Sequence, residues 1–536
     1  MLNFSAHQYP YASQRQSVFA RRGMVAASQP LAAEAGIEIM RHGGNAIDAA
    51  IASAALLTVV EPTGCGLGGD AFALVWTGGQ LHGLSANGQA PAALSIEAVR
   101  AAGHPQMPLY GWTPVTVPGC PSAWAELSRR FGKLPFAQLL QPAIELARDG
   151  FPLSPVVARQ WQIALEEFSP HRDPVLQPWF DTFLIDGRAP RAGEIFRNPA
   201  QARTLQELAA SGCESFYRGE LAQRLDAHSR ATGGYLRASD LADYRAQWVQ
   251  PIKVDYRGYQ VWEIPPSGQG LVALMALKIL EGFNFDHRDS QLTWHRQLEA
   301  MKLAYSDGLH YITDPAHMRV AVADLLSDGY SCRRRGQIGE QAQPPKPGDP
   351  HASGTVYLAT ADAEGNMVSF IQSNYHGFGS GVVLPDSGIA LQNRGQEFSL
   401  DPAHANCLAP GKKTFHTIIP GFLSQGAVPL GPFGVMGGYM QPQGHVQMVM
   451  NLVDFGLNPQ AALDAPRWQW LGDMRVGIEQ GASGDLANAL SRRGHQVQIA
   501  HDSLNYGRGQ IILRDPVSGV LCGGTEPRAD SHIALW

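Results

Sequence analysis

One threonine marks the place where the chain passes from a proline-rich stretch into a strand pattern. Residues 341–354 contain four prolines and two glycines, which predicts an exposed and flexible loop. Thr355 follows directly. Residues 355–361 then alternate as a strand does, and a turn leads to a returning strand at 367–373. The threonine therefore stands between an accessible loop and a rigid hairpin.

Cleavage of the Gly354–Thr355 bond would give this threonine two reactive groups. Its hydroxyl is a nucleophile, and its new α-amino group, with a pKa of about 7.7–8.0, can accept the hydroxyl proton near neutral pH. An N-terminal threonine of this kind attacks amide carbonyls and forms an acyl-enzyme. The spacing alone favours a plain linker before an ordinary strand, so other residues must decide between the two interpretations.

The glycine-rich segment Gly64–Gly69 matches the GxGxxG pattern of dinucleotide-binding loops. That use requires a strand before the glycines, a helix after them and an acidic residue about 20 positions later. Here an apolar helix pattern and Pro62 come first, a strand pattern follows at 71–76, and no Asp or Glu occurs between Asp70 and Glu97. We expect glycines that allow close backbone packing, and no nucleotide cofactor.

Other short motifs offer little chemistry. Two His-Arg-Asp triplets, 171–173 and 287–289, copy one kinase motif without the others, and we expect both in surface loops. The chain has no HExxH sequence, no GxSxG elbow and no cluster of Cys and His residues. Because no local signature of a metal site or a serine hydrolase is present, we expect no metal and no cofactor.

Composition excludes several classes of function. Of the 536 residues, 41 are Lys or Arg and 47 are Asp or Glu, so the formal net charge is −6 and no basic field favours nucleic acid or an anionic membrane. Six cysteines without a CxxC pair indicate free thiols in a reducing compartment. Residues 1–8 lack a signal-peptide pattern, and the longest mainly apolar run, 49–60, is shorter than a membrane span of about 20 residues. We expect a cytoplasmic protein.

Helix patterns begin early in the chain. Apolar residues over 31–42 keep the spacing of one helix face, and Gly43-Gly44 ends the pattern. Asn45 with Asp48 three residues later predicts a capping box at the start of a second helix, 46–60. This second helix is apolar on nearly every side, so we expect it to be buried.

The rest of the chain divides into a part with helix patterns and a part with strand patterns, and it contains no internal repeat. Residues 120–330 read as mostly helical, whereas residues 355–536 are rich in glycine and strand-like. The clearest helix patterns in these two parts are 123–131, 136–149, 292–308, 443–453 and 487–493.

Nine segments, together with Thr355, resemble the γ-glutamyltransferase family of N-terminal nucleophile hydrolases, and within it a branch of YwrD-like transferases and cephalosporin or glutaryl acylases. The segments keep the family's order from about residue 22 to residue 536. They are Gly43–Ala50, Val60–Pro62, Gly66–Gly69, Pro265–Gly268, Glu299–Tyr305, Asp362 with Gly365-Asn366, Phe378–Gly381, Gly437-Gly438 and Pro527-Arg528. The resemblance implies an α/β fold of the αββα sandwich type and a precursor that cuts itself once.

The resemblance also implies where the precursor is cut. Anchored on Asp362, it puts the nucleophile on Thr355 and the cleavage site between Gly354 and Thr355. A large fragment, 1–354, and a small fragment, 355–536, would then remain together as a heterodimer in one αββα unit. A dimer of such heterodimers is a further expectation.

Three more catalytic positions follow from the resemblance. Ser373 falls where the family has a second hydroxyl that hydrogen-bonds the nucleophile, although an ordinary strand serine would look the same in the sequence. Gly437 and Gly438 match the pair whose backbone N–H groups form the oxyanion hole. Glycine suits this place because a side chain would block the approach to the oxyanion.

The substrate-binding positions depart from the family pattern. Asn87 stands where the family has an arginine that binds a carboxylate, and Tyr375 stands where it has an asparagine. Arg394 and Glu397 replace a glutamine and an aspartate, and His416 and Thr417 replace a pair of serines. Loss of the arginine removes a cation and its bidentate fork. Arg394 either takes over the carboxylate or pairs with Glu397 at i, i+3 as a structural ion pair.

The sequence therefore predicts a self-processing γ-glutamyltransferase-like amidohydrolase or acyltransferase. Its expected partners are a small amide, either a γ-glutamyl compound such as glutathione or a related dicarboxylic acyl amide, and water or an amine as acceptor. One alternative is a glutaryl or cephalosporin-type acylase with little γ-glutamyl activity. The other is an uncut, non-catalytic relative that serves as a binding or scaffold protein.

Overall fold

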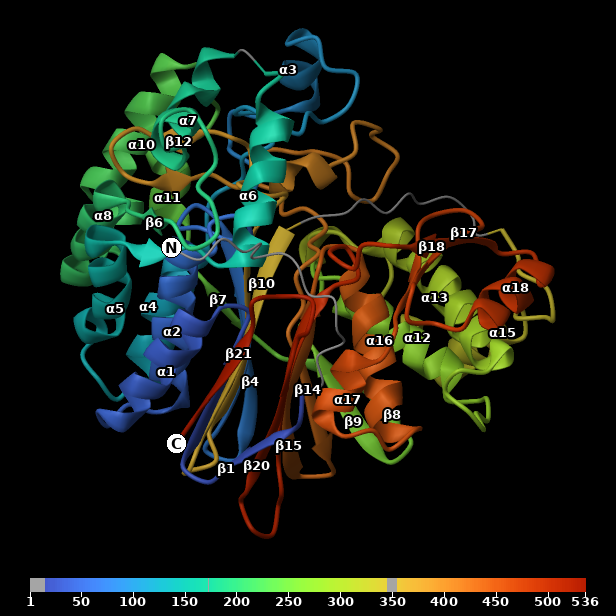
Figure 1. The fold of residues 1–536 in the computed structure, drawn as a ribbon. Coiled ribbons are helices and arrows are strands. Elements are labelled where there is room, and N and C mark those ends of the chain that lie inside the picture. Colours follow the sequence, from blue (N-terminus) through green and yellow to red (C-terminus); the bar gives the residue numbers. More distant parts are fainter. Residues whose placement is uncertain (1–14, 172, 345–353) are drawn as a thin grey trace.

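Two seven-stranded sheets lie face to face between two layers of helices in the computed structural model, which describes residues 15–171, 173–344 and 354–536 (Figure 1). This arrangement confirms the predicted αββα sandwich. The first sheet has the order β21 (His532–Leu535), β2 (Gly23–Ala27), β10 (Gly354–Asp362), β11 (Met367–Tyr375), β3 (Asp70–Thr77), β4 (Gln80–Ala86) and β7 (Gln247–Val249).

The second sheet contains strands from both halves of the chain. Its order is β1 (Val18–Ala20), β20 (Leu521–Thr525), β19 (Arg508–Arg514), β15 (Val428–Met436), β14 (Gly421–Gln425), β9 (Tyr259–Glu263) and β8 (Ile252–Tyr256). The smaller sheets are β5 (Phe151–Pro152) with β6 (Ile195–Phe196), β12 (Val383–Leu384) with β13 (Ile389–Ala390), and β16 (Trp468–Trp470), β17 (Arg475–Glu479) and β18 (Gln496–Ala500).

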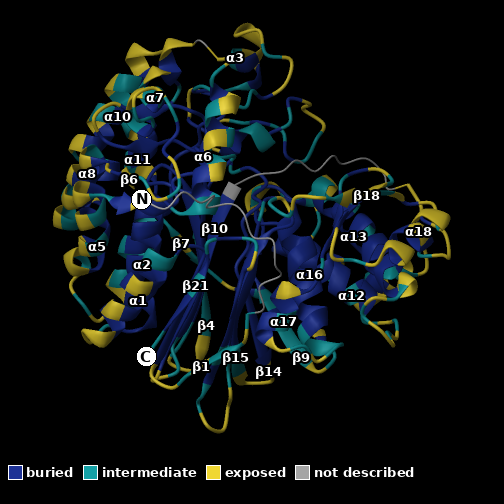
Figure 2. Ribbon diagram, in the orientation of Figure 1, coloured by how far each residue is buried: buried dark blue, intermediate teal, exposed yellow. Residues whose placement is uncertain are grey.

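Each main sheet has its own layer of helices on the outer face, and the surfaces between layers are buried (Figure 2). The first sheet is covered by α1 (Pro30–Arg41), α2 (Ala46–Val60) and α4 (Cys120–Phe131), with α5 (Phe136–Asp149) and α8 (Pro199–Ser211) outside them. The second is covered by α12 (Gly270–Leu280), α16 (Met440–Val453) and α17 (Pro459–Asp464), with α13 (Gln291–Tyr311) packed on α12.

Shorter or peripheral helices complete the chain. They are α3 (Ile96–Ala101), α6 (Pro155–Phe168), α7 (Gln177–Phe183), α9 (Glu214–Arg218), α10 (Glu220–Ala231), α11 (Ala238–Asp243), α14 (Val322–Leu325), α15 (Asp328–Arg335) and α18 (Gly484–Arg492). Within the described part of the chain, no helix combines the length and apolar character that a membrane crossing needs.

The capped helix α2 begins and ends as predicted and anchors the hairpin β10–β11. Asn45 accepts the N–H of Asp48 at 2.9 Å, and Asp48 accepts the N–H of Asn45 at 3.1 Å, which completes the capping box. Asp362, at the end of β10, accepts the N–H of Ala46 at 2.9 Å, and Thr360 donates to the carbonyl of Ala46 at 2.7 Å. The first turn of α2 thus holds the strand that begins next to Thr355.

The glycines of Gly64–Gly69 serve close packing, as expected. A Cβ on Gly68 would lie 2.3 Å from the carbonyl oxygen of Ala390, and one on Gly69 would lie 2.5 Å from that of Ser373. The segment follows helix α2 and precedes strand β3, which is the reverse of a dinucleotide-binding loop. Glycine is required here because the backbones of different elements touch.

The expectations for residues 120–330 and for the two His-Arg-Asp triplets need correction. Residues 120–330 are helix-rich, but 247–263 form β7, β8 and β9, strands of three to five residues that are too short to show a clear period in the sequence. The exposed loop positions expected for the His-Arg-Asp triplets hold for His171, Asp173, His287 and Asp289. Arg288 is half-buried and donates to Asn451 and to the carbonyl of Pro466, and residue 172 lies outside the described residues. So do residues 345–353 of the expected flexible loop and residues 1–8.

Candidate active site

Thr355 lies at an irregularity in the central pair of strands of the first sheet. Gly354 pairs with Tyr375 and Val356 with Gln372, so that Thr355 faces two residues of β11 at a β-bulge. Bulges are common beside active sites because they redirect a side chain. Here the bulge brings the hydroxyl of Thr355 to 3.1 Å from that of Ser373, as the sequence predicts.

Both hydroxyl groups are buried and the second one is oriented. Thr355 and Ser373 have no exposed surface. The backbone N–H of Tyr375 donates to Ser373 Oγ at 2.8 Å, and Tyr375 adopts φ = 79°, a left-handed conformation that is rare for a bulky residue. The distorted end of β11 therefore holds Ser373 Oγ against Thr355 Oγ1.

The expected oxyanion-hole glycines follow the strand that faces β10 from the second sheet. A Cβ on Gly434 in β15 would lie 2.4 Å from the ring of Tyr357, so β15 packs directly on β10 two residues beyond Thr355. Gly437 and Gly438 come next, with φ = 133° and 57°, where glycine is the suitable residue.

The backbone bonds of this turn define where its amides point. The carbonyl of Gly437 accepts the N–H of Met440 at 3.0 Å at the start of α16. Because the C=O and N–H of a trans peptide point in opposite directions, the N–H of Gly438 points away from α16. The N–H of Gly438 is therefore not used by the first turn of α16.

Arg394 is buried completely and only partly satisfied. Its guanidinium lies 4.1 Å from the centre of the Tyr375 ring, and Nη1 donates to Thr417 Oγ1 at 2.6 Å. Its Nε and Nη2 have no acceptor among the described residues. A buried guanidinium with unmet donors is costly unless a ligand or another partner supplies acceptors.

The possible structural ion pair between Arg394 and Glu397 does not form among the described ion pairs. Glu397 accepts hydrogen bonds from the hydroxyl of Tyr375 and, at 2.6 Å, from that of Tyr439. Burial and the nearby Glu397 raise the pKa of both tyrosines well above the usual range, so they remain hydroxyl donors at neutral pH. Glu397 still attracts Arg394 electrostatically.

His416 faces the interior and offers no ring nitrogen to a ligand. Its Nε2 lies 2.9 Å from Asp70 Oδ2, and its Nδ1 accepts the N–H of Ile418 at 3.3 Å, so the hydrogen is on Nε2. Burial, with Arg394 and Lys413 nearby, holds the pKa of His416 well below the usual range. Both ring nitrogens already have protein partners, so the substrate contact expected of His416 stays a prediction.

Asp70, which lies next to His416 and Arg394, is a residue of the candidate site that the sequence did not predict. Burial raises its pKa to about 7, while Arg394 and a 2.9 Å bond from Gln392 oppose the rise. Asp70 is also the cross-strand neighbour of Ser373, as β3 pairs with β11. A signal was available, since Asp70 directly follows the glycine-rich segment and opens a strand pattern.

Asn87 and Thr417 have supporting contacts. Asn87 accepts from the hydroxyl of Ser85 at 2.9 Å and donates to that of Ser267 at 3.0 Å, so it holds neighbouring segments together. Thr417 contacts Arg394. The structure thus connects Thr355, Ser373, Tyr375, Arg394, Glu397 and Thr417 through successive contacts, and it places Asn87 and His416 in bonds to other residues.

One buried cluster has spacing that would suit a metal. Ligand atoms of His295, Glu299 and His495 lie within 4.8 Å of one another. However, Lys302 Nζ lies 2.5 Å from Glu299 Oε1 and balances its charge, and the two imidazoles bond each other at 2.9 Å. Glu299 and Lys302 instead bind the backbone N–H and C=O of Gln343 at 3.1 and 3.0 Å. The cluster therefore ties down the chain shortly before the expected cleavage site.

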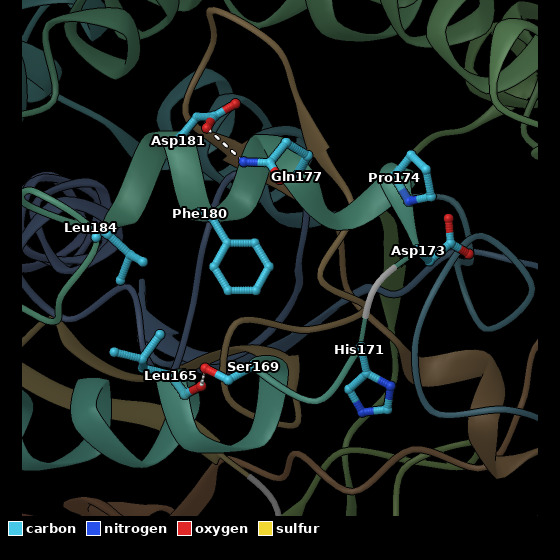
Figure 3. A pocket seen from close by; sticks show the side chains of 10 residues that line it. Leu165, Ser169, His171, Asp173, Pro174, Gln177, Phe180, Asp181 and Leu184 are labelled. Carbon is cyan, nitrogen blue, oxygen red and sulfur yellow. Dashed lines mark hydrogen bonds between the residues drawn. The ribbon is translucent and has the colours of Figure 1, made fainter.

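An open cavity of about 730 Å³ lies elsewhere, between α6 and α7 (Figure 3). Ser169 on its wall donates to the carbonyl of Leu165 at 2.5 Å, and Gln177 donates to Asp181 at 2.8 Å. No hydrogen bond joins Ser169 to His171 or Asp173 among the side chains drawn in Figure 3. The described lining residues therefore form no activated nucleophile.

Comparisons with known proteins agree with this geometry. The family model described as gamma-glutamyltranspeptidase matches residues 32–536. The glutathione hydrolase-like YwrD proenzyme of Bacillus subtilis is 36% identical, with 96% of this chain and 98% of that protein covered. The oxamate amidohydrolase proenzyme of Klebsiella pneumoniae is 38% identical, with 96% and 98% covered.

A solved structure agrees over the whole chain. The crystal structure of cephalosporin acylase from Bacillus halodurans matches with a TM-score of 0.97 and 59% identity, covering 100% of this chain and 99% of that one. The matches in sequence and in structure both extend over nearly all of the sandwich that holds Thr355 and Gly438. The chain belongs to the gamma-glutamyltranspeptidase family of hydrolytic enzymes.

Proposed function

We propose that the chain is a self-processing amidohydrolase whose nucleophile is Thr355. The observation that carries the proposal is the 3.1 Å contact of Thr355 Oγ1 with Ser373 Oγ at the bulge directly after Gly354. Thr355 Oγ1 attacks the carbonyl carbon of Gly354, the Thr355 nitrogen leaves with a proton, and an ester forms. Water hydrolyses the ester, which leaves a carboxylate on Gly354 and a free α-amine on Thr355.

In the cut protein, the α-amine of Thr355 takes the proton of its own hydroxyl as Oγ1 attacks the substrate amide. The N–H groups of Gly437 and Gly438 stabilise the oxyanion of the tetrahedral intermediate. The amine product leaves with the proton, and an acyl-enzyme remains. Water, or an amine in the transferase reaction, attacks the acyl carbon and restores the hydroxyl. Ser373 orients Thr355 Oγ1 through their hydrogen bond.

The acyl group is proposed to carry a carboxylate that binds Arg394. Two donor nitrogens of this buried guanidinium, Nε and Nη2, have no described acceptor, and a carboxylate matches their charge and geometry. The named relatives support this class, since glutathione and oxamate both carry carboxylates. A γ-glutamyl group and a dicarboxylic acyl group such as glutaryl both satisfy this requirement.

A second candidate is an acylase that selects a dicarboxylic acyl group and has little γ-glutamyl activity. Asn87 supplies no cation and is bonded to Ser85 and Ser267, while Glu397 accepts from two tyrosine hydroxyls. These bonds replace contacts that would recognise an α-amino acid head group. The cephalosporin acylase from Bacillus halodurans, 59% identical, adds support for this candidate.

The cut protein is proposed to remain a heterodimer of residues 1–354 and 355–536. In the first sheet, β10 lies between β2 and β11, and β11 lies next to β3. Strands of the two fragments therefore alternate, and separation would break backbone ladders and the buried core. Further pairing of heterodimers and a cytoplasmic location stay predictions.

Mass spectrometry of the purified protein tests the proposed nucleophile. The parent chain should yield a fragment that begins Thr-Val-Tyr-Leu-Ala at Thr355. Thr355→Ala should remain uncut and inactive because it has no hydroxyl, whereas Thr355→Ser should be cut and keep part of the activity. Thr360→Ala, on the same strand, is the matched control and should be cut like the parent. A parent chain that stays intact on long incubation would refute the proposal and leave the non-catalytic alternative.

A further inference from the structure

Gln269 connects two parts of the site that are far apart in the sequence. Its side chain has no exposed surface, and Nε2 donates to the carbonyl of Thr417 at 2.6 Å and to that of Gly438 at 2.8 Å. Thr417 holds Arg394, and Gly438 belongs to the expected oxyanion hole. One buried amide group therefore ties the carboxylate-binding wall to the turn that would stabilise the oxyanion.

The backbone around Gln269 positions this amide. Gly268 and His416 form a parallel bridge, in which His416 N–H donates to Ser267 O and Gln269 N–H donates to His416 O, both at 2.9 Å. Gln269 is also the residue before helix α12, which begins at Gly270. Because its own backbone is bonded, the side chain has a defined point from which to reach both carbonyls.

The donor and acceptor ends of the amide are identified by their partners. Two carbonyl oxygens surround Nε2, and they can only accept hydrogen bonds. On the other side, the hydroxyl of Tyr305 gives its one hydrogen to the carbonyl of Tyr439, and its oxygen lies 3.4 Å from Gln269 Oε1. Gln269 and Tyr305 thus bind consecutive carbonyls, those of Gly438 and Tyr439.

We propose that Gln269 is a positioning residue that holds the Gly438 turn in the orientation needed for oxyanion stabilisation. The inference rests on the proposed function, in which this turn supplies the oxyanion hole. Gly438 has no side chain to restrain its backbone and adopts φ = 57°. Its carbonyl accepts the N–H of Gln441 at 3.1 Å within the turn, and the bond from Gln269 adds a second restraint from outside the turn. The second bond, to Thr417, sets the turn at a defined distance from the wall that contains Arg394.

Gln447 provides a matched control on helix α16. It is also buried, and its Nε2 donates to two backbone carbonyls, those of Gln443 and Trp468, each at 3.0 Å. Neither carbonyl belongs to the proposed oxyanion hole or contacts Arg394. A loss caused only by removing two buried side-chain hydrogen bonds should therefore be the same for both glutamines.

The experiment measures kcat and KM on a glutaryl or γ-glutamyl anilide for Gln269→Met and Gln447→Met. Rates are divided by the amount of fragment that begins at Thr355, so that incomplete cleavage does not alter them. Gln269→Met should lower kcat at least tenfold and change KM less than threefold, since displacement by about 1 Å can cost about 100-fold in rate. Gln447→Met should keep kcat within twofold, although both variants should unfold at lower temperature than the parent.

Gln269→Glu sharpens the test because it keeps the shape and replaces the donors by oxygen. Its kcat should be lower than that of Gln269→Met, since the carboxylate repels both carbonyls. Tyr305→Phe is a milder variant in case the others do not fold, and its kcat should fall about two- to fivefold because only one hydroxyl is removed.

Each outcome separates the inference from the proposed function. Equal kcat values in Gln269→Met and Gln447→Met, or an unchanged kcat in Tyr305→Phe, would overturn the role of Gln269 while the parent remains active. A larger change in KM than in kcat would also overturn it, because it would indicate a role in substrate binding. A parent protein that neither cuts itself nor hydrolyses amides would overturn the proposed function and the inference together.

Discussion

The two ends of the site differ in the residues that build them. The reacting end consists of small groups, Thr355, Ser373 and Gly438, placed by a bulge and by a glycine turn. The recognition end consists of large and charged groups, with Arg394 and Asp70 in its centre. In the proposed mechanism the first end handles an amide and an oxyanion, which every acyl substrate has, while the second must match one acyl group.

The difference teaches how such a site changes its substrate. Buried charges need partners, because an unpaired ion in the interior costs several kcal/mol. In the recognition end, Asp70 attracts Arg394 and bonds His416, and Glu397 binds two tyrosine hydroxyls. An exchange of one charged residue therefore requires exchanges in its neighbours, whereas the reacting end can stay the same.

The largest loss of kcat is expected for a substitution in the reacting end. Gly438→Val should lower kcat by about 10²–10³ because the amide of this turn is the proposed donor to the oxyanion and valine does not tolerate φ = 57°. Steady-state kinetics on the cut protein measure it. Gly456→Val is the control, since Gly456 has φ = 62° with no atom near its Cβ position. Activity of Gly438→Val within a few-fold of the parent would place the oxyanion hole elsewhere.

A smaller and selective loss is expected at the recognition end. Arg394→Met should lower kcat/KM about 10- to 100-fold on glutaryl and γ-glutamyl anilides, because a hydrogen bond to a charged group contributes about 1.5–3 kcal/mol. A butyryl anilide, which has no carboxylate, should be hydrolysed as by the parent. Full kcat/KM of Arg394→Met on both charged substrates would remove Arg394 from the site.

The same substrates rank the two candidate activities. Because Asn87 is neutral and Arg394 suits any distal carboxylate, we expect glutaryl and γ-glutamyl anilides to differ less than about 100-fold in kcat/KM, or about 2.7 kcal/mol. A larger preference for the γ-glutamyl substrate would show that the recognition end selects the α-amino acid head group.

The smallest expected effect is a pH dependence of substrate binding. Since burial raises the pKa of Asp70 to about 7, this carboxyl gains a proton between pH 8 and pH 6 and no longer neutralises Arg394. KM for a carboxylate substrate should then fall several-fold, while kcat falls separately as the α-amine of Thr355 is protonated. Asp70→Asn should give a KM that hardly changes over this range. A KM that rises toward pH 6 in the parent would contradict this coupling.

Elements with local causes could be predicted from the sequence. The bounds of α2 and its capping box follow from Asn45, Asp48 and a mainly apolar run, all within 16 residues. The hairpin β10–β11 follows from alternation around one turn. The strands β8 and β9 were missed because five residues carry little pattern, and because β9 is stabilised by pairing with β14, far along the chain.

The site residues likewise divide into those with local causes and those with distant partners. Thr355 and Ser373 are 18 residues apart on one hairpin, and the resemblance in sequence was enough to pair them. Asp70 and His416 are 346 residues apart, and Gln269 and Gly438 are 169 apart. No pattern in a single sequence reports contacts of that kind, so the partners of His416 and the bond from Gln269 to Gly438 could not be predicted.

The amino-acid sequence by itself determined the family, and it predicted the nucleophile, its hydroxyl neighbour and the glycine turn, because these depend on residue types at short or ordered spacing. The tertiary structure decided which charged groups meet. It turned His416 toward Asp70, separated Arg394 from direct pairing with Glu397, and left two donor nitrogens of Arg394 without a described acceptor. The physical reason is that a buried charge is stabilised by whatever the fold brings within a few ångströms, and only the packed sheets and loops define that set.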